Sequence, residues 1–596
     1  MIVKVKNKIR NNEKISNDQI IKILLKNRGI KDEKNFFYPP LPTSISLFDF
    51  DKKYEKSFQK VIEILKEIKT KNQKIVVYTD YDADGITGGA IMWETLYLLG
   101  FDVMPYVPDR VKEGYGFSIK GINNVIEKYH PSLIISVDHG ITKVKEVDYL
   151  RSKNIKVIIT DHHLKSNQTP NAQAIFHIPA LSGSGVAYFF AKEVFNNFKN
   201  HSLNSRLLEN YFSSDYLSLA SIGTIADLVP LIGPSRSIVK YGLEIFPKVR
   251  RVGIRHILKE AGIEGKKITP YEIGFMIAPR INASGRLENA IDSLRLLCTK
   301  KEDRALKLAA YVGKINRQRQ DLLEKSVNEA RFALVKKMKQ LNFFSATCVD
   351  EYSFKKEFFA LAENKNLSAN DLKNIPKLII LISKNWHEGI IGLIASKIAD
   401  EFYRPTIVLT KSNGHYKASA RSIKGFHITN FLRELRGFLI EVGGHEQAAG
   451  FSIEEKQVNQ FIKIALEKAN EQIEDQILEK TFFADLQIPV SLINLNLVKH
   501  IENLAPFGIS NPQPVFYSEV ILSDAKIFGK KNEHLKIFVK DENSLSSTNT
   551  LELIAFNQAH LFSSLSRHQK IKVLYTLEID HWGNQEKLRG KVIKIF

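Results

Sequence analysis

The stretch from Val76 to Ala90 constrains what this chain can fold into more than any other. An apolar run comes first, carboxylates follow at Asp80, Asp82 and Asp84, and glycines then lead into a helical run, Ala90 to Leu99. This order is typical of a buried strand, a tight turn and a helix. If the acidic segment is extended, alternation places the three carboxylates on one side. We expect them to bind Mg²⁺ or Mn²⁺, which prefer oxygen ligands, and a solvated acidic turn is the alternative.

The same pattern, an apolar strand followed by an acidic residue, recurs twice. Leu133 to Val137 precedes Asp138, and Val157 to Thr160 precedes the run Asp161-His162-His163. Near-continuous apolar strands with helical segments between them predict a parallel sheet covered on both faces. Ligands of such sheets bind at the carboxyl ends of the strands, so these side chains are expected to meet at one edge. A further apolar segment ends in Asp227, which either caps the next element or joins the metal-binding set.

Composition limits the classes of protein and of partner. The 596 residues predict several domains, and 86 basic against 65 acidic residues give a net charge of +21, which suits a polyanionic partner. The only cysteines, Cys298 and Cys348, exclude a disulfide framework and a cysteine-ligated zinc site. No apolar run approaches the roughly 18 residues of a membrane span. We expect a soluble, cytoplasmic protein with no membrane contact.

The second half of the chain shows another α/β pattern and then a series of short strands. A strand at Leu378 to Ile382 leads through a Gly-containing turn into a helix that ends at Phe402. Five β-rich segments between Ile521 and Ile595, with one short helix at Leu497 to Leu504, favour an OB-type barrel. The polar stretch from Asn342 to Pro376 is interpreted as variable surface.

Several segments resemble known motifs. Four of them resemble motifs I to IV of the DHH phosphoesterase superfamily: Asp82-Ala83-Asp84-Gly85, Val137-Asp138, Asp161-His162-His163 and Gly223-Thr224-Ile225-Ala226-Asp227. The run Ile277 to Leu287 narrows this to a resemblance to the RecJ family of single-strand-specific exonucleases. Further segments are similar to the DHH-associated domain and the C-terminal barrel of that family: Trp386 to Gly392, Ala418 to Ser422, Gly443 to Phe451 and Ala505 to Phe516.

The resemblance implies an α/β fold made of several parts. An N-terminal segment at residues 1–50 would precede a parallel-sheet DHH domain (51–290), a long helical connector (291–345), a second α/β DHH-associated domain (346–475) and a C-terminal OB-type β-barrel (476–596). It also implies a metal-dependent 5′→3′ exonuclease that releases nucleoside 5′-monophosphates from single-stranded DNA in repair and recombination. Single-strand-binding protein and a RecQ-type helicase are the protein partners that the family suggests.

Two divalent cations, Mn²⁺ or Mg²⁺, are expected at the edge of the sheet, about 3.5–4 Å apart as in other two-metal sites. Asp138, at the middle strand end, is expected to bridge them, with Asp82 mainly on one ion. The remaining roles are these: Asp84, His162 and Asp227 bind the other ion, His163 contacts the scissile phosphate, Asp80 and Asp161 orient ligands, and His139 is structural.

Substrate contacts are expected from donors that suit phosphate and from a ring that can stack. They are Arg110, Tyr115, Arg280, Asn282, Ser284, Arg286, His387, Ser419, Arg421, Gly443, Gly444 and His445. Glycines at a helix start would let backbone N–H groups approach an anion closely. Two alternatives stay open: a phosphodiesterase of short oligonucleotides or cyclic dinucleotides (or a pyrophosphatase) on the same fold, and a non-catalytic single-strand-binding scaffold.

Overall fold

The computed structural model describes residues 2–10, 15–339, 347–348, 375–412, 414–542, 550–580 and 586–596. The described chain forms two compact units. One consists mainly of Lys314–Phe482, and the other of Val3–Gly313 together with Phe483–Phe596. Nearly all of the stretch interpreted as variable surface, Asn342 to Pro376, lies outside the described residues.

The first part of the larger unit is built on a five-stranded, fully parallel sheet of order β3-β2-β4-β5-β6. Its strands are β2 (Ile75–Thr79), β3 (Val103–Tyr106), β4 (Leu133–Val137), β5 (Lys156–Asp161) and β6 (Ala174–His177). Every residue of β2 and β4 is buried, as the apolar runs predicted.

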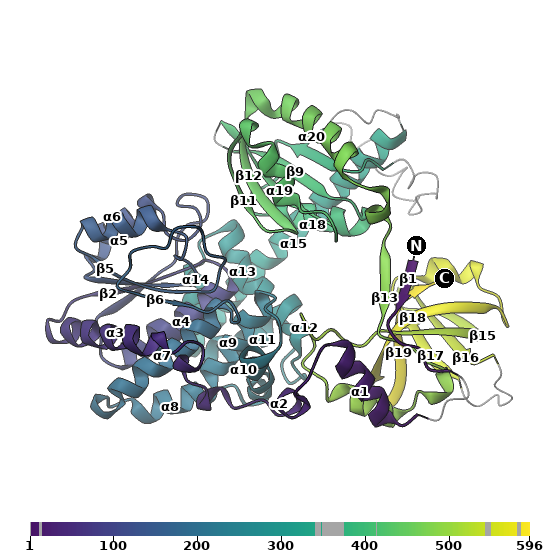
Figure 1. Cartoon of the computed structure of the whole chain (residues 1–596), viewed down its shortest axis with the longest axis horizontal. Helices are drawn as coiled ribbons and strands as arrows, with labels where there is room; N and C mark the ends of the chain where they lie inside the picture. The colour runs from purple at the N-terminus through teal and green to yellow at the C-terminus, as the bar shows by residue number, and fades with distance from the viewer. Residues whose placement is uncertain are drawn as a thin grey trace. The chain divides into compact units, whose positions relative to one another are not determined.

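Helices cover both faces of this sheet, so both faces of the strands are apolar (Figure 1). On one face lie α5 (Ile119–Tyr129) and α6 (Val144–Ser152), and on the other lie α3 (Lys53–Thr70), α4 (Ala83–Leu98) and α7 (Gly183–Phe198). Behind α4 pack α9 (Asp215–Ala226), α13 (Ala278–Leu287) and α14 (Ile291–Cys298). The predicted parallel-sheet domain is therefore confirmed.

The C-terminal part of the larger unit is a closed barrel. Its strands run in the order β14-β15-β16-β17-β19-β18, where β14 is the short strand Leu486–Gln487, and an additional β15–β18 pairing closes the sheet. The main strands are β15 (Phe516–Phe528), β16 (His534–Lys540), β17 (Leu551–Ala555), β18 (Lys570–Asp580) and β19 (Lys587–Ile595), with a short helix α21 (Leu495–Glu502) beside them. Burial alternates along β16, as expected for a barrel wall with one face inward. Closure removes the exposed edges, and the predicted OB-type barrel is confirmed.

The N-terminal segment shares its core with this barrel, which the sequence did not predict. Ile20 and Leu24 of α1 (Asn17–Asn27) are buried in one cluster with Leu486 and other barrel residues. Arg236 of α10 (Gly233–Ile245) is buried at the junction, where its guanidinium donates to the carbonyl oxygens of Phe36, Leu504, Ala505 and Pro506. This buried cation thus bonds to both the N-terminal segment and the segment that leads into the barrel.

The smaller unit contains a six-stranded mixed sheet of order β11-β12-β10-β9-β8-β7, in which β7 is the short strand Thr347–Cys348. Its long strands are β8 (Ile379–Ser383), β9 (Thr406–Ser412), β10 (His415–Arg421), β11 (Leu439–Gly444) and β12 (Ala448–Glu454), and α18 (Ile391–Phe402) connects β8 to β9. The predicted long helical connector is α15, 38 residues from Glu302 to Lys339. In the described ranges, no helix combines the length and apolar character needed to cross a bilayer.

Candidate metal and phosphate site

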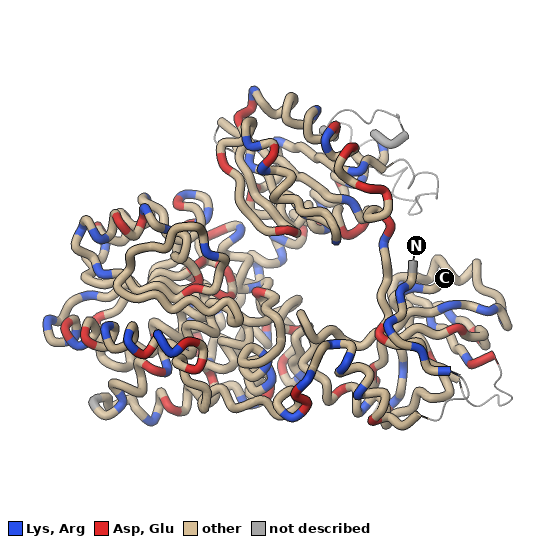
Figure 2. The backbone as a smooth tube through the Cα atoms, in the orientation of Figure 1, with Lys and Arg blue, Asp and Glu red and all other residues tan. Residues whose placement is uncertain are grey.

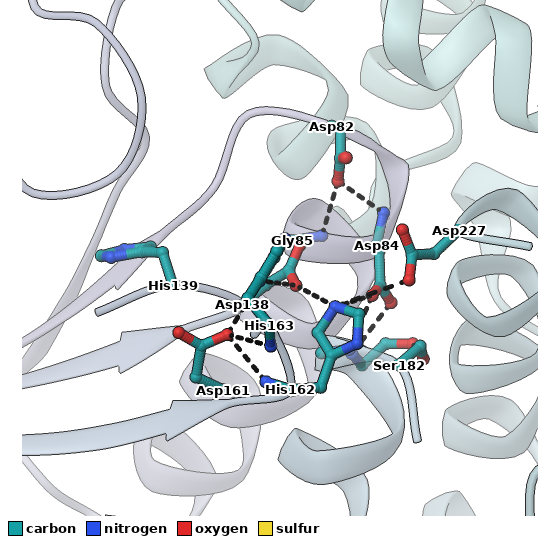
Figure 3. Close-up of polar contacts among 12 residues, drawn as sticks. Asp82, Asp84, Gly85, Asp138, His139, Asp161, His162, His163, Ser182 and Asp227 are labelled. Carbon is teal, nitrogen blue, oxygen red and sulfur yellow. Dashed lines mark hydrogen bonds and ion pairs between the residues drawn. The ribbon is translucent and has the colours of Figure 1, made fainter. Parts of the chain in front are cut away.

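Acidic and imidazole side chains gather at the carboxyl edge of the parallel sheet (Figure 3). Asp80 and Asp82 follow β2, and Asp138 follows β4. Asp161 is the last residue of β5, and His162 and His163 come directly after it. Because β2, β4 and β5 are neighbours in the sheet, their ends lie side by side. Asp227, directly after α9, reaches the same place.

The acidic turn after β2 is folded into the start of a helix. Asp82 is the N-cap of α4, and its carboxylate accepts hydrogen bonds from the N–H groups of Asp84 and Gly85, each at 3.0 Å. The extended alternation expected for the three carboxylates is therefore wrong beyond Asp82, because Asp84 belongs to the first turn of α4. The Asp84 carboxylate accepts from the N–H groups of Gly183 and Ser184 at 2.6 and 2.9 Å, at the positive end of α7.

The described residues include three groups of side chains that could hold a metal ion, and within each group the ligand atoms lie within 4.8 Å of one another. Asp84, His162 and Asp227 form one set, which is the group expected on one ion. The other two sets both contain Asp138: Asp138 with His162 and His163, and Asp138 with Asp80 and Asp82. His162 Nε2 lies 3.1 Å from Asp138 Oδ1 and 3.5 Å from Asp227 Oδ2. Asp138, at the end of the middle strand, thus lies beside the group of Asp84, His162 and Asp227 and also belongs to the group of Asp80 and Asp82. A ligand that bridges two ions requires this position.

The electrostatics of this cluster call for a cation. Burial, together with the charges of Asp84 and Asp82, raises the pKa of Asp138 well above its usual range. Burial and the Asp84 carboxylate likewise raise the pKa of Asp82. Among the described residues, Asp80 Oδ1, Asp138 Oδ1 and His162 Nε2 are buried and make no hydrogen bond, although the last two atoms lie 3.1 Å apart. Unpaired buried acceptors are costly, and divalent ions would satisfy them while removing the repulsion, so the residues present fit two such ions.

His163 differs from His162 in its partners. Its Nδ1 lies 2.8 Å from Asp161 Oδ1 and its Nε2 lies 3.1 Å from the Tyr115 hydroxyl. Burial opposes the charged imidazole, but the hydrogen bond and charge of Asp161 outweigh it and raise the pKa of His163 to about 9. A protonated imidazole is a poor metal ligand and a good partner for phosphate, which agrees with the role expected for His163.

Asp161 and His139 occupy supporting positions. The Asp161 carboxylate accepts from the N–H groups of His162 and Ile141 as well as from His163, so it orients both histidines. Burial opposes its charge, yet these hydrogen bonds hold the pKa of Asp161 below its usual range. His139 is buried, with Nε2 3.0 Å from the Tyr78 carbonyl oxygen and its ring against Phe117. Its position is the structural one that was expected.

We expect the D227N variant to be more stable than the wild-type protein at about pH 8 in chelator, by about 1–2 kcal/mol. Burial and the charges of Asp84 and Asp82 raise the pKa of Asp227 from 3.8 to about 8. The native state therefore holds this proton more tightly than the unfolded chain. The resulting stability is complete below the unfolded pKa and is lost as the pH rises toward 8. Asparagine stays neutral, so the advantage should shrink at about pH 5. Thermal unfolding at both pH values measures it, and a variant less stable at both would contradict the assignment.

The loop after β3 brings Arg110 and Tyr115 to the cluster. The Tyr115 hydroxyl contacts His163 and the Asp138 carbonyl oxygen, the latter at 3.4 Å. The Arg110 guanidinium lies over the ring of Tyr81, 5.3 Å from its centroid. Tyr81 was not among the expected site residues, and its place between two acidic ligands in the sequence is the signal that could have drawn attention to it.

The expected contacts on α13 divide into different roles. Asn282 Oδ1 accepts from the Ala83 N–H at 2.6 Å, so it holds the turn that carries Asp82 and Asp84. Arg280 pairs with Glu260 and donates to the Met276 carbonyl oxygen. Arg286 is close enough to Tyr81 to influence its pKa.

Ser284 is fully buried, and its hydroxyl is shared between the Ile281 carbonyl oxygen and Ser293 Oγ. Because that hydroxyl faces the protein interior, the expected contact between Ser284 and substrate is wrong. The hydroxyl-bearing side chain in the motif was taken for a phosphate donor, when its partner is the neighbouring helix α14.

In the smaller unit, Ser419 and Arg421 lie together on β10. Arg421 Nη1 donates to Ser419 Oγ at 3.1 Å, and a Cβ on Gly392 would lie 3.0 Å from that oxygen. The first turn of α18 therefore packs directly against this pair, and His387 precedes it with its Nδ1 accepting from the Gly389 N–H. A hydroxyl, a guanidinium and a helix start are suited to phosphate.

Gly443 and Gly444 require a correction. They lie in strand β11, paired with Gly450 and Ala449 of β12, so the helix-start argument does not apply to them. His445 lies in the turn of this hairpin, and its N–H donates to the Ala448 carbonyl oxygen at 2.8 Å. The sequence did not distinguish the two structures, because a pair of glycines is compatible with a β-hairpin as well as with a helix start.

Three family models match the chain: "DHH family, N-terminal domain" at residues 74–224, "DHHA1 domain" at 374–471 and "RecJ OB domain" at 484–594. A protein of Haemophilus influenzae named single-stranded-DNA-specific exonuclease RecJ is 30% identical over 548 residues, which cover 89% of each chain. This chain belongs to the RecJ family. The resemblance inferred from the motifs is thereby confirmed.

Two further comparisons extend this result. The RecJ protein of Bacillus subtilis is 31% identical over 556 residues, covering 90% of this chain and 63% of that relative. This chain thus spans less than two thirds of the Bacillus relative. The crystal structure of RecJ in complex with Mn²⁺ from Thermus thermophilus matches with a TM-score of 0.75 and 25% identity, over 100% of this chain and 79% of the other.

Two glycines of this RecJ-family chain pack directly against the carboxylates of the site. A Cβ on Gly183 would lie 2.4 Å from Asp138 Oδ1, and one on Gly223 would lie 2.3 Å from Asp84 Oδ1. Only hydrogen fits between these backbones and the carboxylates. Gly223 stands in a segment that resembles a family motif, but the close approach of either glycine to a distant aspartate leaves no local sequence signal.

Proposed function

We propose that this protein is a metal-dependent 5′→3′ exonuclease that degrades single-stranded DNA to nucleoside 5′-monophosphates, in DNA repair and recombination. The observation that carries the proposal is the cluster around Asp138, where three overlapping groups of ligand atoms include buried acceptors that make no hydrogen bond, in a chain of the RecJ family. The names of the relatives support single-stranded DNA as the substrate. A DNA substrate in turn supports the proposal that the protein acts in the cytoplasm, where bacterial DNA lies.

Asp82 and Asp138 would hold one divalent ion, and Asp84, His162 and Asp227 the other, with Asp138 bridging. When bound, such ions lower the pKa of a water molecule and stabilise charge on the leaving oxygen. The chain's own groups supply the rest. Asp161 keeps His163 protonated and oriented, so that its imidazolium can neutralise a non-bridging phosphate oxygen. Arg110 of the larger unit is proposed to bind the 5′-terminal phosphate, and Tyr115 to stack on the terminal base. Ser419 and Arg421 are proposed as the phosphate contacts of the smaller unit.

The test compares four substrates in Mn²⁺: long single-stranded DNA, the matching duplex, a linear dinucleotide and a cyclic dinucleotide. Strands labelled at the 5′ or the 3′ end report direction. The proposal expects mononucleotides from the 5′ end of long single strands, and no release after chelation. Turnover of only the short substrates would favour the phosphodiesterase alternative, and binding without hydrolysis would favour the scaffold. Single-strand-binding protein and a RecQ-type helicase remain proposed partners.

We expect the barrel to contribute length-dependent affinity. Lysine and arginine residues follow its strands (Figure 2), and Lys591 Nζ lies 5.6 Å from the centroid of Phe556, whose side chain is 38% exposed. Stacking of a base on one aromatic ring contributes about 1–3 kcal/mol to binding. Each phosphate contact steepens the slope of log affinity against log salt concentration by about one.

F556A combined with K591A should therefore weaken binding to long strands by at least about tenfold and flatten its salt dependence, while dinucleotide turnover persists. K60A, at an exposed position on α3, is the matched control. Titrations of strands of increasing length at two salt concentrations measure the effect. Equal affinity of the double variant and wild type would remove this face of the barrel from the proposed path.

A further inference from the structure

Arg110, the residue proposed to bind the terminal phosphate, has an unusual set of partners. Within the described part of the chain it makes no hydrogen bond and no ion pair, so the N–H groups of its guanidinium are available to a ligand. What the guanidinium does contact is the face of Tyr81, at 5.3 Å from the ring centroid. An arginine side chain carries about 2 kcal/mol of rotamer entropy, so a free one must be ordered at a cost when phosphate binds.

The main chain that carries Arg110 is held by its own hydrogen bonds. The Asp109 carboxylate accepts from the N–H groups of Val111 and Lys112, each at 3.0 Å. Glu113 accepts from the Tyr106 hydroxyl at 2.8 Å. The loop thus has a defined path, and the direction of the Arg110 side chain depends on the ring beneath it.

Tyr81 is fixed from the opposite side. Its residue lies between Asp80 and Asp82, and its carbonyl oxygen lies so close to α13 that a Cβ on Gly285 would approach it to 2.6 Å. Its half-buried ring makes an edge contact with Tyr115 at 6.2 Å. The ring therefore has a defined position relative to the carboxylates that would hold the metal ions.

We propose that Tyr81 is a positioning residue for 5′-end recognition: its ring face holds the Arg110 guanidinium at a fixed place relative to the acidic cluster. The inference rests on the proposed function, because it takes Arg110 as the ligand of the terminal phosphate. A guanidinium that lies over an aromatic face keeps its N–H groups free at the edge of its plane. Two of these N–H groups can then donate to two oxygens of one phosphate. The side chain of Tyr81 thereby connects the turn that would bind metal with Arg110, which would bind the 5′-terminal phosphate.

The test compares 5′-phosphorylated and 5′-hydroxyl strands of one sequence with the wild type, Y81L, Y81F, R110A and the Y81L/R110A double variant. Y81L should raise KM for the phosphorylated strand about 5- to 30-fold with kcat retained, and leave the 5′-hydroxyl strand nearly unchanged. Y81F keeps the ring and should keep the wild-type ratio between the two ends. The double variant should match R110A alone, because both changes remove the same interaction.

Three results would overturn the inference. They are an unchanged end preference in Y81L, an equal loss on both kinds of end, which would indicate base stacking or a disturbed metal turn, and additive effects in the double variant. Stabilisation by Mn²⁺ in thermal unfolding should be equal in Y81L and wild type. Affinities for both strands, measured in chelator, separate the two proposals: a wild type that prefers 5′-phosphate through Arg110 without hydrolysing DNA contradicts the function and not the role of Tyr81.

Discussion

Replacement of Asp138 by alanine is expected to abolish hydrolysis of single-stranded DNA. The side chain belongs to two of the three sets of ligand atoms, so its loss removes a ligand from both proposed ions. Loss of one oxyanion-hole donor costs about 10²–10³-fold in kcat, and loss of a ligand shared by two ions should exceed that. Hydrolysis at saturating Mn²⁺ is the measurement, and substantial turnover by D138A there would refute the bridging role.

The same variant should still fold and bind. Asp138 is buried with an unpaired oxygen beside other carboxylates, so its removal relieves repulsion in the metal-free protein. In chelator, D138A is expected to unfold at or above the wild-type temperature and to keep its affinity for long single strands. A large loss of stability would show that the missing activity reports unfolding.

Gly183 to alanine is expected to be nearly as damaging, although no metal contact is assigned to this residue. The added Cβ would meet Asp138 Oδ1 and Cβ at 2.4 Å, so the carboxylate must move. Overpacking of this kind costs about 1–3 kcal/mol of stability, and a displacement of about 1 Å in a catalytic group can cost about 10²-fold in rate.

The control for this variant is G437A, because a Cβ on Gly437 has open space around it. G183A should lower both the unfolding temperature and kcat, and should weaken the stabilisation by Mn²⁺. G437A should alter none of these. Wild-type kcat in G183A would mean that the site adapts, and that the close approach of α7 to Asp138 does not position the carboxylate.

The sequence predicted the sheet and its acidic edge because both depend on local patterns. Apolar runs that end in acidic residues specify parallel strands, and neighbouring parallel strands deliver those residues to one place. The sequence did not predict the path of the chain beyond strand β2. Asp84 was expected in an extended segment, but the N-cap hydrogen bonds of Asp82 start α4 at Ala83 and turn the Asp84 carboxylate toward α7.

What the sequence could not predict depends on contacts between distant segments. The hydroxyl of Ser284 pairs with Ser293 of the neighbouring helix, and Gly183 at the start of α7 approaches Asp138 at the end of β4. The shared core of α1 and the barrel, with Arg236 buried between them and the sheet domain, is of the same kind. This core also means that removing the barrel would expose apolar residues of the N-terminal segment, so surface substitutions such as F556A with K591A test the barrel more cleanly than truncation.

The most direct test of the metal centre is anomalous diffraction from crystals of the wild-type protein soaked in Mn²⁺. The account predicts two peaks about 3.5–4 Å apart, both at ligand distance from the Asp138 carboxylate, with Asp82 on one and Asp84, His162 and Asp227 on the other. A single peak, or two peaks that do not share Asp138, would contradict it.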